Sequence, residues 1–172
     1  DIKDASRAFT GWTIAPKIPR NPLGRFYWNY EYKPEDHDDG EKTFLGHTGA
    51  LDGNDIIDIV VKQPATAQFL ARHMYNFFVA DEPQVPSWNI TPPNDPEAVQ
   101  SLVDAYNESG YNVRSMLKVL FTSDFFKNAR FARVKSPAEL VVGTAKTAGN
   151  YTGPRPGLNK LAMECNWQGQ EL

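Results

Sequence analysis

The sequence predicts a mostly α-helical fold, a bundle of about six helices with one small β-hairpin. Apolar side chains recur at spacings of three and four along most of the chain, and helix-capping residues precede several of these stretches. Residues 26–32 instead show the two-residue alternation and the aromatic content of a strand. Because 41% of the 172 residues are hydrophobic, the chain can build one core, and we expect a single domain over residues 1–172.

The N-terminal part of the predicted fold runs from a helix to the hairpin. Residues 1–9 have helical spacing, and three prolines predict an irregular loop over residues 14–24. The aromatic strand at residues 26–32 is followed by an aspartate-rich turn at 33–40 and a returning strand at 42–45. An isolated two-stranded ribbon is only marginally stable in water, so we expect this hairpin to pack on the helices.

The rest of the chain is predicted to be helical. Asn54 and Asn112 are candidate N-caps, and Pro64 suits the first turn of a long helix. The strongest local signal is a capping box, in which Ser136 is followed by a proline and, three residues on, by Glu139. Helices are expected over residues 54–61, 64–80, 95–110, 112–121, 136–149 and 158–172. The end helices have no complete start or stop signals, so we expect the chain to be a fragment of a longer protein.

Composition argues against several classes of partner. The 18 basic and 21 acidic residues give a net charge of -3, so we expect no binding to nucleic acid. No segment approaches the ~20 apolar residues of a membrane span. Cys165 is the sole cysteine, which excludes an intramolecular disulfide. The sequence leaves the oligomeric state open.

The predicted turn contains a candidate metal site. Asp36, His37 and Asp38 place oxygen and imidazole donors side by side, and His47 could add a further ligand. The spacing differs from that of a helix-loop-helix calcium loop, because Gly40 is fifth from Asp36 and position twelve is His47 rather than glutamate. The alternative is a solvated turn, in which aspartate and glycine are favoured for backbone reasons. We therefore predict no cofactor, with a divalent cation at these four residues as the alternative.

The aromatic strand is the candidate ligand-binding surface. One face of the strand is expected to pack inward, and the other could present Tyr27, Trp28 or Tyr30 as a stacking platform for a sugar, a peptide or a partner chain. Lys42 and Arg7 are the cations that we associate with this surface. The competing interpretation is that these rings only build the core and protect an edge strand.

Several segments resemble one bacterial family. Residues 4–12 (DASRAFTGW) and 37–46 (HDDGEKTFLG) carry the resemblance, and residues 63–71, 109–114 and 134–140 agree with it in the same order. The chain is thereby similar to the middle of the family called domain of unknown function 1800. The resemblance implies an exported protein with an extracytoplasmic location, often encoded beside a sulfatase-like partner family. It implies no catalytic residues.

Two functions are consistent with the sequence. We expect an exported binding or scaffold module that meets a partner protein, an envelope polymer or other segments of the same longer chain. The alternative is a metal-assisted hydrolase with His37 and Asp38 as ligands, His47 as a further ligand or base, and Lys42 or Arg7 as the electrostatic stabiliser. The sequence does not decide whether the protein is an enzyme.

Overall fold

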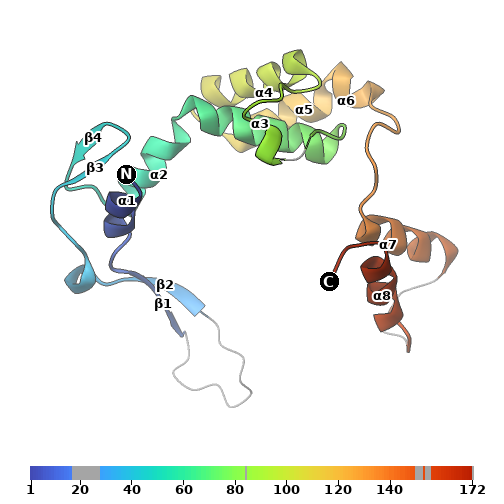
Figure 1. Ribbon diagram of the computed structural model, residues 1–172, viewed down its shortest axis with the longest axis horizontal. Coiled ribbons are helices and arrows are strands. Elements are labelled where there is room, and N and C mark those ends of the chain that lie inside the picture. Colours follow the sequence, from blue (N-terminus) through green and yellow to red (C-terminus); the bar gives the residue numbers. More distant parts are fainter. Residues whose placement is uncertain (17–27, 84, 150–152, 154–155, 172) are drawn as a thin grey trace. The chain divides into compact units, whose positions relative to one another are not determined.

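The computed structural model describes residues 1–16, 28–83, 85–149, 153 and 156–171 (Figure 1). In this part of the chain, helices predominate, and the strands form two antiparallel sheets of two strands each. The predicted mostly α fold with a small hairpin is confirmed, with a second small sheet added. The chain divides into two compact units, one of residues 1–69 and 107–111 and the other of residues 70–106 and 112–172.

The first unit contains both sheets. Its elements in chain order are α1 (Ile2–Ala8), β1 (Trp12–Pro16), β2 (Trp28–Tyr32), the 3-10 turn η1 (Pro34–Asp36), β3 (Lys42–Phe44), β4 (His47–Gly49) and α2 (Gly53–Val61). The helices predicted over residues 1–9 and 54–61 therefore form as α1 and α2. Their packing against each other is close, with Ala8 of α1 and Ile56 of α2 buried.

The strand pairing differs from the prediction. The aromatic strand β2 pairs with β1, with Trp12 opposite Tyr32 and Ile14 opposite Tyr30. The expected partner at residues 42–45 forms β3 and pairs with β4 instead. The loop predicted from residue 14 onward was also wrong in its first residues, because β1 continues to Pro16. Proline is tolerated at the end of such a strand, where no ladder hydrogen bond requires its missing N–H; residues 17–24 of that loop lie outside the described residues.

The start of α2 requires a glycine and is capped by an aspartate. A Cβ atom on Gly53 would lie 2.6 Å from Cζ2 of Trp12, so no larger residue fits there without a shift of the ring. The N-cap is Asp52, whose side chain accepts hydrogen bonds from the backbone N–H groups of Asn54 and Asp55, and Asp55 completes a capping box. The predicted cap at Asn54 was therefore wrong by two residues.

Helices make up most of the second unit. The remaining elements are α3 (Pro64–Phe78), which begins in the first unit, η2 (Val85–Ser87), α4 (Pro96–Glu108), α5 (Val113–Thr122), α6 (Asp124–Asn128), α7 (Pro137–Ala148) and α8 (Asn159–Trp167). The large side chains that are almost fully buried here are Leu102, Tyr106, Met116, Leu120 and Cys165. The predicted caps at Asn112 and Ser136 are confirmed, and α6 is an additional short helix capped by Ser123. Among the helices of the described chain, none has both the length and the apolar character needed to cross a bilayer.

The proline-rich segment between α3 and α4 is held by a buried ion pair. Nε of Arg72 lies 2.7 Å from Oε2 of Glu82, and the two side chains are 6% and 0% exposed. Arg72 also donates hydrogen bonds to the carbonyls of Thr91 and Pro92 and lies over the ring of Trp88. A buried arginine is stable only when its donors are satisfied. This segment is therefore organised around one guanidinium group.

Candidate functional site

The predicted acidic turn is joined to α1 by an arginine. Nε and one terminal nitrogen of Arg7 donate to the two carboxylate oxygens of Asp38, over 2.7 and 3.1 Å. The other terminal nitrogen donates to Asp4, 3.1 Å away, and to the carbonyl oxygen of Glu41. A two-pronged arginine–carboxylate pair is directional as well as attractive. Arg7 thus fixes the turn at the C-terminal end of α1.

The carboxylates of this network are held in their charged form. Hydrogen bonds from Arg7, followed by one from the Gly40 backbone N–H, lower the pKa of Asp38 to about 2. The pKa of Asp4 is also lowered, first by a hydrogen bond from the Thr43 N–H and then by Arg7. The same contacts raise the pKa of Arg7, and all three groups stay ionised at neutral pH.

Lys42 fills the inside of the turn. Its side chain is buried, with 1% of the residue exposed, and its ammonium group donates to the backbone carbonyls of Asp38 and Gly40. A primary ammonium group has three donors and no acceptor, so it suits a ring of carbonyl oxygens much as a small cation would. Lys42 therefore places a positive charge of the chain itself inside the turn.

His37 is used to hold the turn against the end of α1. Its Nδ1 lies 2.8 Å from the Thr10 carbonyl oxygen, which can only accept, so Nδ1 carries the proton. The Thr10 hydroxyl in turn accepts a hydrogen bond from the Asp38 N–H over 2.8 Å. The imidazole packs edge-on against the ring of Tyr32, and its Nε2 lies 4.0 Å from the exposed carboxylate of Asp39.

The four predicted metal ligands occupy different surroundings. Asp36 is exposed at the end of η1, Asp38 is paired with Arg7, and His37 bonds Thr10. Within the described part of the chain, no group of three or more His, Cys, Asp or Glu side chains is arranged to hold a metal ion. The divalent cation stays a prediction, and binding it through Asp38 would require the loss of contacts to Arg7.

His47 lies beside a separate hollow of the first unit. This hollow has a volume of about 350 Å³ and is lined by His47, Thr48, Leu51, Asp55, Asp58, Ile59, Lys62 and Gln63. One of its two carboxylates, Asp55, already accepts the Asp52 N–H as part of the α2 capping box. The structure thus places His47 with α2 and not with the acidic turn.

The β1–β2 ribbon presents an apolar face to solvent. Residues directly opposite in an antiparallel pair share a face, so Trp12, Ile14, Tyr30 and Tyr32 lie together on one side. Ile14 and Tyr30, which face each other, are 62% and 61% exposed, and Tyr32 is 44% exposed. We call these three residues the ribbon face. The ring of Tyr30 contacts that of Trp12 edge-on, with centroids 5.3 Å apart.

The predicted ligand-binding residues are therefore divided among different roles. Tyr30 lies on the ribbon face, whereas Arg7 and Lys42 belong to the network of the acidic turn. Trp28 is the first residue of β2, opposite Pro16, and Tyr27 lies outside the described residues. Sequence reasoning assigned no role to Thr10 or Ile14. Thr10 lies in the segment 4–12 that resembles the family, and this resemblance could have indicated its importance. Ile14 was assigned to a loop, so no pattern indicated its role.

The comparison with protein families identifies the chain. It belongs to the family described as "Protein of unknown function (DUF1800)", whose profile matches residues 1–172. The resemblance in residues 4–12 and 37–46 is thereby confirmed. No curated protein and no solved structure matches the chain.

Proposed function

We propose that this chain is a non-catalytic binding module that engages a partner protein through the ribbon face. The observation that carries the proposal is the pair Ile14 and Tyr30, which lie opposite each other with more than half of each residue exposed. Large apolar side chains held side by side in solvent are typical of interaction sites. Tyrosine also suits a binding surface, because it combines a rigid ring with a polar hydroxyl group.

A polypeptide is the partner that this surface fits best. In the described residues, the sheet contains only β1 and β2, so each strand has an edge with unpaired backbone groups. An extended segment of a partner could add to such an edge by backbone hydrogen bonds, while its side chains cover the adjoining face. The aliphatic side chain of Ile14 favours a protein over an envelope polymer, since sugar rings are bound mainly by aromatic faces.

The polar groups of the acidic turn support a binding role over a hydrolytic one. Asp38 and His37 join the turn to α1 and its end through Arg7 and Thr10, and Lys42 binds carbonyl groups of the turn itself. A metal-assisted hydrolase would need Asp38 to exchange Arg7 for a cation, although His37 could keep its bond to Thr10 and ligate through Nε2. The family resemblance further supports an exported protein, so we place the binding event outside the cytoplasm.

Site-specific photo-crosslinking tests the proposal. A benzophenone amino acid is placed at Tyr30 or at Ile14 in the producing cell, and the matched control places it at Glu31, which is exposed on the opposite face of β2. We expect one discrete protein adduct from the first two positions and none from Glu31, and Ile14→Asp should abolish the Tyr30 adduct. Equal adducts from both faces, or none, would contradict the proposal, and a carbohydrate adduct would indicate an envelope polymer.

Metal analysis of the purified chain tests the alternative. A stoichiometric cation that is lost in His37→Ala would support the hydrolase. Secretion is tested by fractionating cells that make the natural full-length protein, and recovery in the cytoplasm would contradict the exported location.

A further inference from the structure

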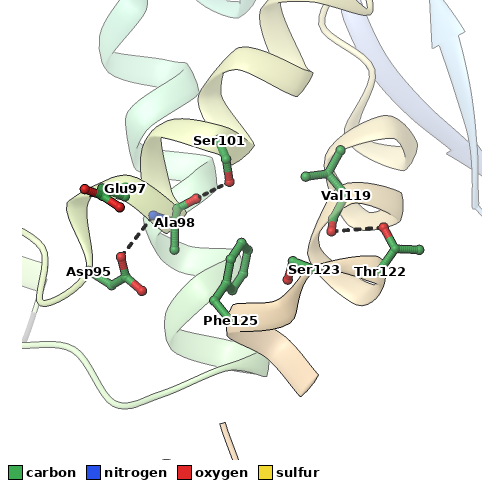
Figure 2. A pocket seen from close by; sticks show the side chains of 8 residues that line it. All are labelled: Asp95, Glu97, Ala98, Ser101, Val119, Thr122, Ser123 and Phe125. Atoms are coloured by element: carbon green, nitrogen blue, oxygen red, sulfur yellow. Dashed lines mark hydrogen bonds between the residues drawn. The ribbon is translucent and has the colours of Figure 1, made fainter. Parts of the chain in front are cut away.

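A second hollow lies within the second unit, where the start of α4 approaches the end of α5 and the start of α6 (Figure 2). Its volume is about 440 Å³, which falls in the range of small-molecule sites. Its lining residues are Asp95, Glu97, Ala98, Ser101, Val119, Thr122, Ser123 and Phe125. None of them belongs to the acidic turn or to the ribbon face.

The hydroxyl groups of this hollow already donate hydrogen bonds to backbone carbonyls. Ser101 donates to the Ala98 carbonyl over 2.7 Å, and Thr122 donates to the carbonyls of Lys118 and Val119 over 2.8 and 3.3 Å. Ser123 donates to the Leu120 carbonyl over 2.6 Å. Figure 2 shows the hydroxyls of Ser101 and Thr122 turned toward the backbone of their own helices. The Ser123 oxygen also accepts the Phe126 N–H as the cap of α6, so a ligand meets chiefly the lone pairs of Ser101 and Thr122 and not their hydrogens.

The charged groups of the hollow are both negative. Asp95 accepts the Ala98 N–H with one carboxylate oxygen, and among the described residues neither Asp95 nor Glu97 forms an ion pair. The N-terminus of α4 contributes about half a positive charge, which is less than the charge of the two carboxylates. Burial, followed by the charge of Asp95, raises the pKa of Tyr75, whose ring packs near Phe125. The lining of the hollow therefore has a net negative charge.

The floor of the hollow is apolar. Phe125 projects into it in Figure 2, and Ala98 and Val119 flank the ring. An aromatic face attracts a cation, and the effect adds to that of nearby carboxylates. We propose that this hollow binds an organic cation, with an ammonium or guanidinium head that donates to Asp95, Glu97 and the hydroxyl oxygens and a short apolar stem that packs on Phe125.

Two sources could supply this chemistry. The cation could be a free amine, or it could be the side chain of an arginine or lysine in a polypeptide. The shared requirement is several N–H donors, a positive charge and a stem of a few methylene groups. Agmatine represents the free form, and N-acetyl-arginine amide represents the side chain.

An NMR titration with these two probes tests the proposal. The chemical shifts of the residues that line the hollow are recorded as each probe is added. We expect saturable shifts with at least one probe and none with N-acetyl-citrulline amide, which has the same shape without the charge. Asp95→Asn should weaken binding at least about tenfold while the helix stays capped, because asparagine caps as well as aspartate does. Glu97→Gln, at an exposed position, should weaken binding in the same direction.

Asp104→Asn provides the matched control. Asp104 lies on the same helix, is exposed and does not line the hollow, so its loss changes the net charge equally. Binding of agmatine alone would identify a free amine as the ligand, and binding of the arginine amide alone would identify a side chain. Equal binding of the citrulline probe, equal weakening by Asp104→Asn, or no saturable shift with either cation would overturn the proposal.

Discussion

Lys42 and Arg7 bring two positive charges to one acidic turn, and both are tethered to the chain that they neutralise. Lys42 is only two and four residues from the carbonyl groups that it binds. A tethered group acts at a high effective concentration, so it competes strongly with any free cation. At the residue scale, Arg7 and Lys42 hold the turn together, and Asp38 is the aspartate that this network uses.

The low pKa of Asp38 predicts an acid-sensitive contact. Because the folded-state pKa of about 2 lies below the ordinary value, ionised Asp38 stabilises the fold above about pH 4. That stabilisation is lost as the pH falls toward 2. We expect Asp38→Asn to lower the free energy of unfolding at pH 7. The variant should also show a smaller decrease of this free energy between pH 4 and pH 2 than the wild type, as measured by denaturant unfolding at each pH.

Other carboxylates lose stabilising contacts in the same pH range. The pKa of Glu139 is lowered to about 2, chiefly by Arg133, so the decrease in the wild-type protein is a sum over several groups. The difference between wild type and Asp38→Asn isolates one of them. Asp36→Asn, at an exposed neighbouring position, is the control. Parallel pH curves for wild type and Asp38→Asn would show that the ion pair with Arg7 does not stabilise the fold.

The β3–β4 hairpin has an unfavourable residue in its turn. Leu45 and Gly46 have φ values of 45° and 82°, which suit asparagine and glycine but not leucine. The left-handed conformation costs a residue such as leucine roughly 1–2 kcal/mol. We expect Leu45→Asn to raise the free energy of unfolding by about 1 kcal/mol in denaturant titrations. Gly46→Ala is the control with the opposite effect and should lower the free energy of unfolding. If Leu45→Asn is less stable than the wild type, the Leu45 side chain makes contacts that outweigh the backbone strain.

Strand pairing is the element-scale feature that the sequence did not determine. The aromatic alternation identified β2, but its partner β1 has only the short stretch from Trp12 to Pro16 and ends in a proline. Residues 17–27 separate the two strands in the sequence, so no short turn motif indicated their pairing. Helices were predicted better, because caps such as Ser136 with Glu139 act within a few residues.

At the scale of the whole molecule, local signals predicted the elements, while the candidate sites depended on distant contacts. Arg7 meets Asp38 across 31 residues, and the hollow beside Phe125 joins the start of α4 to the end of α5. Spacing within a motif contains no information about such contacts. The cluster of aspartates indicated a metal site in the sequence, which stays a prediction, and the structure adds that one of these aspartates, Asp38, pairs with Arg7 of α1.

The distribution of charge predicts that the chain does not bind nucleic acid. Its net charge is -3, because 21 acidic residues outnumber 18 basic ones, and four of the basic residues, Arg7, Arg72, Lys127 and Arg133, are paired with carboxylates in the described part of the chain. Nonspecific binding requires several free basic groups that displace the counterions of the phosphate backbone. We expect the fluorescence anisotropy of a labelled DNA duplex to stay constant up to about 100 µM protein at physiological salt. A rise in anisotropy that diminishes as salt is added would show a basic surface that this pairing leaves uncovered.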